Sequence, residues 1–264
     1  MIKLFIEREE IRACGVMGLF PANTVNADDI EIYDPQDTGT VLATLTGLRQ
    51  QTPMPDGKAN NCLSDFVAPA SANVSDTIGC FAVTAGMGLD NLIEEFDQQN
   101  DTYSSILAKA IGDRFAEAFA EYLHREVRMD YWGYAADEKL SREEVIAEKY
   151  RGIRPASGYP ACPDHTQKPV LWDLLSVEKH TGISLTESLA MWPASSVSGW
   201  YFSHPESRYF GVGKIGRDQV TDYAVRRDMD IQAAEKWLAP NLAYELESNN
   251  WVAKSYKKQS ATQS

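Results

Sequence analysis

The sequence has no long apolar run, and none of its segments approaches the roughly 20 apolar residues that a membrane-spanning helix needs. It also lacks a targeting segment, because the opening MIKLFIEREE turns acidic after its first apolar residues and no signal-peptide core with a small-residue cleavage site follows. Positive charge is scarce, with 25 Lys and Arg against 38 Asp and Glu and a net charge of -13. Such a surface repels phosphate backbones and anionic lipid. We therefore expect a cytoplasmic protein without nucleic-acid or membrane partners.

The familiar motifs of disulfide, metal and nucleotide chemistry are missing as well. The four cysteines are far apart in apolar or loop contexts, which favours reduced, buried thiols over a disulfide framework: Cys14, Cys62, Cys80 and Cys162. Cys162 and His165 in CPDH have the spacing of metal ligands, but one pair without a second does not define a metal site. No histidine is marked by its context as the base for a cysteine nucleophile. No GxGxxG or Walker loop follows a predicted strand.

Hydrophobic patterning nevertheless predicts strands at two places in the chain. Apolar and β-branched runs in the first third predict five strands, over residues 13–25, 28–34, 40–48, 63–69 and 76–86. The first of these is expected to stop in a turn at Pro21 and Asn23. Near the other end, the run over 195–216 predicts two strands around a turn at 204–207.

Helical periodicity occupies the middle and the end of the sequence. A short helix and then a long amphipathic one are predicted over 89–127, where large apolar residues recur at helical spacing: Leu107, Ile111, Phe115, Phe119 and Leu123. Three later helices are predicted from their end signals: one opening with the capping-box pair Ser141 and Glu144, one over 168–182 ending at Gly182, and one over 217–240 stopping at Pro240.

The order of these elements predicts the fold class. Strands come first as a meander with short links, helices follow, and two strands return near the end. This order favours an α+β fold with a largely antiparallel twisted sheet and flanking helices over a doubly wound one. The chain is long enough to bury a large core, and we expect one domain over residues 1–247 followed by a polar tail over 248–264.

The long helix carries a row of carboxylates. Asp113, Glu117 and Glu121 follow one another at i, i+4 spacing, and a solvated helix face is the simplest interpretation of the row. Glu117 is the exception, because its neighbours in the sequence are apolar. A carboxylate at the edge of a buried face can receive an ammonium group or a ribose hydroxyl.

The segment GIRPASGYPACPDHTQKPVLWDLL, residues 152–175, contains four prolines and two glycines between two helical segments. A proline-rich loop is pre-ordered, so little entropy is lost when a ligand binds it. Arg154, next to Pro155 and ahead of Gly158 and Tyr159, has the character of a fixed donor for a ligand carboxylate. The sequence therefore predicts a small-molecule site at this loop, while the residues alone do not identify the ligand.

Beyond these patterns, the chain resembles the C-terminal activation domain of cobalamin-dependent methionine synthase. The similarity extends over nearly the whole chain and rests on these segments taken together: GLFPANTV, LRQQ, LSDFVAP, DRFAEAFAEYLH, YWGYA, YRGIRPASGYPACPDHT, LTESLAMWPASSVSGWYFSHPESRYF, RDQV and WLAPNL.

The resemblance implies binding of S-adenosylmethionine and reactivation of a cobalamin that has been oxidised to cob(II)alamin. A reduced flavodoxin or similar donor would supply an electron, and the methyl group would pass to cobalt. No catalytic acid or base is implied, because a sulfonium is already a good leaving group. The resemblance assigns Arg154, Ala156, Gly158 and Tyr159 to the S-adenosylmethionine site, with Tyr159 also facing the corrin. It assigns Glu117 to the ligand's amino group, and Tyr209 and Phe210 to its adenosine.

The resemblance also implies missing parts. The family's domain begins further upstream, with an aromatic-rich W-x-P-F-F segment whose acidic neighbour contacts the ligand. Because this chain opens at Met1 without it, we expect a pocket that lacks one edge and binds S-adenosylmethionine more weakly.

The substrate modules, with their zinc, and the cobalamin-anchoring D-x-H-x-x-G signature are absent too. We therefore expect the cobalamin-binding module and a flavodoxin-type donor as partners, and no methionine synthesis by the chain alone. The alternative is a docking module for a cobalamin protein or an electron donor that does not transfer methyl.

Overall fold

The computed structural model describes residues 1–246, so the predicted polar tail lies outside the described residues. The chain divides into two compact units, Met1–Gly213 and a second that begins at Lys214. The candidate site belongs to the first unit. Among residues 1–246, no helix combines the length and the apolar character needed to cross a membrane.

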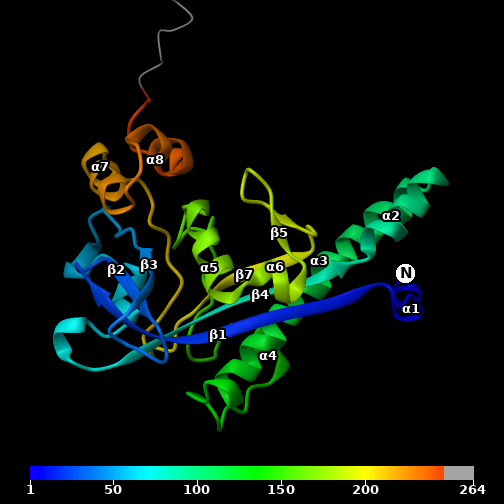
Figure 1. The fold of residues 1–264 in the computed structure, drawn as a ribbon, viewed down its shortest axis with the longest axis horizontal. Coiled ribbons are helices and arrows are strands. Elements are labelled where there is room, and N and C mark those ends of the chain that lie inside the picture. The colour runs from blue at the N-terminus through cyan, green and yellow to red at the C-terminus, as the bar shows by residue number, and fades with distance from the viewer. Residues whose placement is uncertain (247–264) are drawn as a thin grey trace, which may run out of the picture. The chain divides into compact units, whose positions relative to one another are not determined.

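The first unit is built on a five-stranded sheet with the order β3-β2-β1-β4-β7 (Figure 1). Every neighbouring pair in it is antiparallel. The strands are β1 (Arg12–Val25), β2 (Asp29–Tyr33), β3 (Val41–Thr46), β4 (Asp76–Met87) and β7 (Ser196–Tyr201). A separate two-stranded hairpin is formed by β5 (Ser184–Leu185) and β6 (Met191–Trp192). The predicted α+β class with a largely antiparallel sheet is confirmed.

Six α-helices accompany the sheet in the first unit: α1 (Ile2–Glu7), α2 (Leu89–Gln98), α3 (Thr102–Glu126), α4 (Arg142–Ile146), α5 (Lys168–Leu175) and α6 (Val177–Thr181). The end of α3 widens into a π-helical turn over Val127–Tyr131. The predicted pair of helices over 89–127 is confirmed, and so is the capping box at the start of α4, where Ser141 and Glu144 exchange hydrogen bonds. The first helix, α1, was not predicted.

Strand β4 contributes to a hydrophobic core on each face of the sheet, because its successive side chains point to opposite faces. Its residues Ile78 and Cys80 belong to the core that contains Leu171 and Trp172 of α5. Its residue Phe81 packs instead with residues of α3. Helices α5 and α3 therefore cover opposite faces of the sheet at this strand.

Helix α3 approaches the sheet through small residues rather than through the large apolar residues that revealed it. Its most buried apolar positions are Ala108, Ala116 and Ala120, spaced at one or two turns. The larger residues of the helix, such as Phe119 and Leu123, are partly buried beside this line and pack against the same core. This contact face of small residues lets the helix backbone lie close to the strands.

Three predicted strand features are wrong. Strand β1 does not stop at Pro21 but continues to Val25. Its pairing with β2 begins only at Ala22, so the missing N–H of Pro21 removes no hydrogen bond between these two strands. Residues 63–69 do not form a strand. They begin with the 3₁₀ turn Leu63–Phe66, where the Asp65 carboxylate accepts a hydrogen bond from the Cys62 N–H at 2.8 Å.

The segment after the predicted turn at 204–207 is not a strand either. The turn itself is present, with Ser207 N–H donating to the His204 carbonyl at 3.0 Å. The chain then leaves the sheet, and Val212 N–H donates to the carbonyl of Pro160 at 2.8 Å. The helix predicted over 168–182 is real and ends at Gly182 as expected, but Ser176, with φ of 46°, divides it into α5 and α6.

The second unit contains α7 (Arg217–Arg226), α8 (Ile231–Trp237) and the 3₁₀ turn Ala239–Asn241. The predicted helix over 217–240 is therefore interrupted between α7 and α8. Ile215, before α7, is hydrogen-bonded to the segment after α8. Its N–H donates to the Asn241 carbonyl and its carbonyl accepts from the Ala243 N–H, both at 2.9 Å.

The close approach of α3 predicts a position-specific response to added volume. Ala120 is fully buried and packs with Phe81 and Tyr201, so Ala120→Leu should overfill the space and lower the free energy of unfolding by about 1–3 kcal/mol. Ala118→Leu, on the exposed face of the same helix, should change it by less than about 0.5 kcal/mol. Urea denaturation of both variants measures the difference, and equal effects would contradict this packing.

Candidate functional site

The proline-rich loop is fastened to the edge of the sheet by backbone hydrogen bonds. Ile153 and Phe202 exchange N–H to carbonyl bonds of 3.1 and 3.0 Å, and Trp200 N–H donates to the Pro155 carbonyl at 2.9 Å. Gly199 permits this approach, because a Cβ at that position would lie 2.7 Å from the Pro155 oxygen. The start of the loop therefore behaves as a further short strand beside β7. Ile153 points into the core, and Arg154, the next residue, lines the cavity described below.

The tip of the loop is closed by its own backbone. Tyr159 N–H donates to the Ala156 carbonyl at 3.1 Å, Cys162 N–H to the Tyr159 carbonyl at 2.9 Å, and Gly158 N–H to the Cys162 carbonyl at 2.7 Å. Gly158 has φ of +94°, and a Cβ there would lie 2.1 Å from Cε1 of His165. This close packing explains why the loop needs glycine at that position.

The CPDH pair forms part of this packing. Cys162 closes the tip of the loop and His165 lies against Gly158. Within residues 1–246, no group of three or more His, Cys, Asp or Glu side chains is arranged to hold a metal ion.

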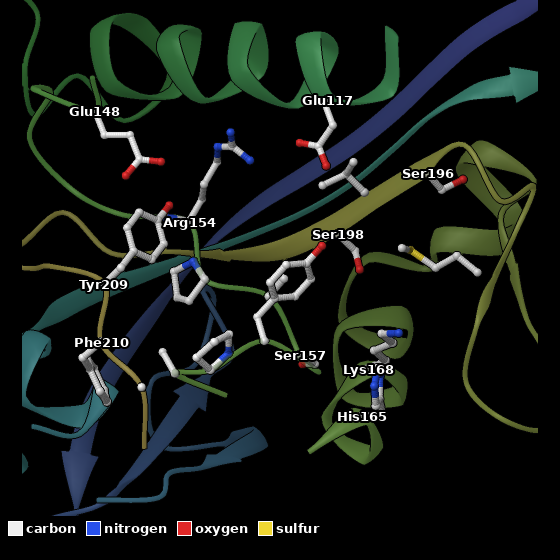
Figure 2. A pocket seen from close by; sticks show the side chains of 18 residues that line it. Glu117, Glu148, Arg154, Ser157, His165, Lys168, Ser196, Ser198, Tyr209 and Phe210 are labelled. Carbon is white, nitrogen blue, oxygen red and sulfur yellow. The ribbon is translucent and has the colours of Figure 1, made fainter. Parts of the chain in front are cut away.

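A cavity of about 560 Å³, which we call the loop cavity, lies between this loop, α3, β7 and the segment after the turn at 204–207 (Figure 2). This volume is in the range of small-molecule sites. Its lining residues are Glu117, Glu148, Arg154, Pro155, Ala156, Ser157, Tyr159, Pro160, Ala161, His165, Lys168, Met191, Ser196, Val197, Ser198, Tyr209, Phe210 and Gly211.

Arg154 is the central charged group of the cavity. Its Nη2 donates to Oε2 of Glu121 at 3.0 Å, and its backbone N–H donates to the Tyr209 hydroxyl at 3.0 Å. Burial lowers the pKa of Arg154, but the Glu121 carboxylate outweighs burial and raises it, so the guanidinium stays charged. The side chain is only 18% exposed, and its buried Nε has no hydrogen-bond partner within the described chain. Figure 2 shows the side chain pointing toward α3, with Glu148 on one side and Glu117 on the other in that view.

Behind Arg154 lies a second, fully buried guanidinium. Arg128 donates to both carboxylate oxygens of Glu138, at 2.9 and 2.8 Å, and lies 4.1 Å over the ring of Tyr150. Its Nη1 is 3.9 Å from Oε1 of Glu121. Glu121 also accepts a long hydrogen bond of 3.5 Å from the Tyr150 hydroxyl. The Glu121 carboxylate is therefore placed between two arginines, one buried and one facing the cavity.

His124 completes the buried cluster without adding charge. It is fully buried and stacks on Tyr201 with ring centroids 5.0 Å apart. Burial, together with the positive charges of Arg128 and Arg154, lowers the pKa of His124 well below its usual value. The imidazole is therefore neutral near pH 7, and the charges of the cluster are those of the arginines and glutamates.

The predicted site residues lie together, with one difference of role. All of them except Gly158 line the loop cavity: Glu117, Arg154, Ala156, Tyr159, Tyr209 and Phe210. Gly158 shapes the loop behind the cavity wall. Tyr159 is 62% exposed at the loop tip, whereas burial raises the pKa of Tyr209, whose hydroxyl holds the Arg154 backbone. Which of these side chains contact a ligand remains a prediction.

The carboxylate row on α3 is only partly the solvated face that its spacing suggests. Asp113 accepts a hydrogen bond of 2.7 Å from the Ser195 hydroxyl, and Glu121 is paired with Arg154. Glu117, between them, faces the loop cavity with no hydrogen bond or ion pair to another side chain of the described chain.

Several cavity residues were missed by the sequence reasoning. Glu148 follows the short helix α4 with φ of +53°, and no periodicity marks it. Lys168 was assigned only to a helix, yet its Nζ donates to the Leu189 carbonyl at 2.8 Å and burial lowers its pKa. The left-handed backbone of Glu148 is uncommon for this residue type, but it is a property of the folded chain rather than of the sequence.

Comparison with known proteins assigns the class. The family model of the activation domain of vitamin B12 dependent methionine synthase matches residues 1–228, and the chain belongs to this family. It is accordingly a domain of a cobalamin-dependent methyltransferase. Among solved structures, the chain is similar to the MetH reactivation domain bound to AdoHcy, with 56% sequence identity and a TM-score of 0.90 over 93% of this chain and 75% of that one.

The geometry at Gly158 predicts that the loop tolerates no side chain there. Gly158→Ala should destabilise the protein by about 1–3 kcal/mol, because the left-handed backbone and the contact with His165 both oppose a Cβ. Gly211→Ala is the control, since the nearest atom to its Cβ would be at 3.5 Å. Thermal denaturation compares the two variants. Adding His165→Ala to Gly158→Ala should restore part of the loss, and a Gly158→Ala protein as stable as the parent would contradict the account.

Proposed function

We propose that the loop cavity binds S-adenosylmethionine and presents its methyl group to a cobalamin held by another module of methionine synthase. The observation that carries the proposal is the fixed guanidinium of Arg154 in a cavity that carboxylate and aromatic side chains also line. The similar domain that was solved with AdoHcy, at 56% identity, supports a ligand of this chemical class.

The groups in the cavity match the three parts of the ligand. Arg154 suits the carboxylate of the methionine moiety, because a guanidinium presents parallel donors to it. Glu117 and Glu148 suit the ammonium group as acceptors of charge-assisted hydrogen bonds. Tyr209 and Phe210 offer aromatic faces for the adenosine, and electron-rich rings also favour a sulfonium.

The aromatic wall is held in place by its own contacts. Phe210 packs edge-on against Phe66 with ring centroids 6.4 Å apart. Tyr209 is fixed through the hydrogen bond of its hydroxyl with the Arg154 backbone. Because these side chains are ordered before the ligand arrives, binding costs less side-chain entropy.

The residues of this chain contribute positioning rather than acid–base chemistry. When the methyl group of a sulfonium is transferred, the C–S bond breaks and the leaving group is a neutral thioether, which needs no protonation. No residue therefore has to move a proton, and the rate depends on the alignment of the methyl carbon with its acceptor. Cobalamin supplies a cobalt that accepts the methyl group. We assign to Tyr159, at the exposed loop tip, a contact with the corrin.

The partners follow from the same assignment. We propose that the cobalamin-binding module docks at the loop tip and that flavodoxin or a similar protein supplies the electron for reductive methylation. The net charge of -13 favours protein partners over nucleic acid or anionic lipid. Methyl transfer is then an activity of the complete methionine synthase, and we expect this chain alone to bind ligand without making methionine.

The role of Arg154 is tested by titration calorimetry with S-adenosylmethionine. Arg154→Ala should weaken binding by about 1.5–3 kcal/mol, the range for a charged hydrogen bond. Arg154→Lys should restore only part of it, because an ammonium does not reproduce the guanidinium fork. Arg151→Ala serves as the control, since that arginine bonds the carbonyls of Ser203 and Tyr134 instead of lining the cavity. Unchanged binding in Arg154→Ala would rule out the assignment.

The role of Tyr159 is tested by separating binding from transfer. In the complete enzyme, Tyr159→Ala should slow reductive methylation of cobalamin by a larger factor than it weakens S-adenosylmethionine binding, because the side chain is assigned to the corrin. Tyr131→Ala, another exposed tyrosine at 58%, should affect neither. Equal losses of binding and transfer would mean that Tyr159 only lines the ligand cavity.

A further inference from the structure

We propose that Glu121 is a positioning residue, which holds Arg154 in the orientation that receives the ligand carboxylate. The inference rests on the proposed function, since it concerns how the carboxylate-binding arginine is aimed. Glu121 itself does not line the cavity. It lies one helical turn beyond Glu117 on α3, and its Oε2 accepts a hydrogen bond from Arg154 Nη2 at 3.0 Å.

The need for such a residue follows from the charges around Arg154. Glu117 and Glu148 line the same cavity, and neither has an ion pair among residues 1–246. A mobile guanidinium next to unpaired carboxylates would pair with one of them. That pairing would occupy both the donor for the ligand carboxylate and an acceptor for its ammonium group. By accepting a hydrogen bond from Nη2, Glu121 keeps Arg154 from pairing with Glu117 or Glu148.

The position of Glu121 is in turn fixed by buried groups. The guanidinium of Arg128 is fully buried, is locked on Glu138 by two hydrogen bonds, and lies 3.9 Å from Glu121 Oε1. The Tyr150 hydroxyl bonds the other oxygen, Oε2, at 3.5 Å. Because the hydrogen bonds of Arg128 go to Glu138, Glu121 Oε2 remains free to accept a hydrogen bond from Arg154. The buried Arg128 thus helps to fix Glu121, and Glu121 in turn fixes Arg154 in the cavity.

The donors left on Arg154 agree with this role. Glu121 takes one hydrogen of Nη2, while the buried Nε has no hydrogen-bond partner in the described chain. A guanidinium carries five N–H donors in a fixed plane. Fixing one Nη2 hydrogen orients the plane and leaves the other Nη donors for a ligand, and this pre-organisation reduces the cost of binding.

The test compares S-adenosylmethionine with its decarboxylated analogue, which keeps the ammonium, sulfonium and adenosine but lacks the carboxylate. The measured quantity is the ratio of the two dissociation constants. In the parent chain we expect the analogue to bind about 10–150-fold more weakly, the value of one charged hydrogen bond. Arg154→Ala should bring the ratio close to one. Glu121→Gln should lower the ratio at least threefold, and the double variant should match Arg154→Ala alone, because the two residues act as one unit.

The ratio separates positioning from a general structural effect. Loss of folded protein weakens both ligands equally and leaves the ratio unchanged. Glu126→Gln is the matched control, since this glutamate of α3 pairs with Arg125 away from the cavity, and its ratio should equal that of the parent. Glu121→Asp retains the charge between the two arginines but shortens the reach to Arg154, so it should also lower the ratio and provides a second variant if Glu121→Gln does not fold.

The outcomes distinguish the two levels of the proposal. If Arg154→Ala leaves the ratio unchanged, the carboxylate contact of the proposed function is wrong. If Arg154→Ala removes the preference while both Glu121 variants keep the parent ratio, the proposed function stands and the positioning role of Glu121 is overturned.

Discussion

The candidate site depends on a short stretch of backbone pairing between residues 153–155 and strand β7. The hydrogen bonds of Ile153 with Phe202 and of Pro155 with Trp200 turn the start of the loop into an edge strand. Side chains alternate along such a strand, so Ile153 enters the core and Arg154 faces the cavity. Proline suits the edge because it has no N–H to offer a further strand. Without this pairing, the arginine would lie on a flexible loop and the cavity would lose one wall.

Helix α3 connects that wall to the rest of the fold. Its alanine face lets it lie close to the sheet, and its carboxylates, each one turn apart, then meet three different surroundings. Asp113 bonds Ser195 near the start of β7, Glu117 faces the cavity, and Glu121 reaches Arg154. The same residue type at the same spacing therefore has three roles, and the role depends on what lies opposite each turn of the helix.

Local signals in the sequence were sufficient for much of the fold. The apolar period over 89–127, the capping box at Ser141 and the prolines of the loop each report on neighbours within a few residues, and each predicted its element correctly. The strand predicted over 208–216 is wrong, because Tyr209 and Phe210 line the cavity and Val212 N–H bonds the Pro160 carbonyl of the loop instead of a strand.

The site itself was predictable in part. The proline-rich loop pointed to Arg154, and the family resemblance added the aromatic residues that line the cavity. The pairing of Arg154 with Glu121 and the left-handed backbone of Glu148 were not predictable, since both arise from contacts between segments that are distant in the chain. A row of acidic residues on a helix is consistent with many surroundings, and only the packed structure selects among them.

The carboxylate row also links helix α3 to both ends of strand β7. Asp113 and Glu121 are two turns apart on one rigid helix, a distance of about 12 Å along its axis. Asp113 accepts a hydrogen bond from Ser195, just before β7, and Glu121 accepts one from Arg154, beside the far end of the same strand. Any displacement of α3 along its axis therefore moves both carboxylates by the same amount. The rigid helix therefore keeps Ser195, just before β7, and Arg154, beside the far end of that strand, at a constant separation.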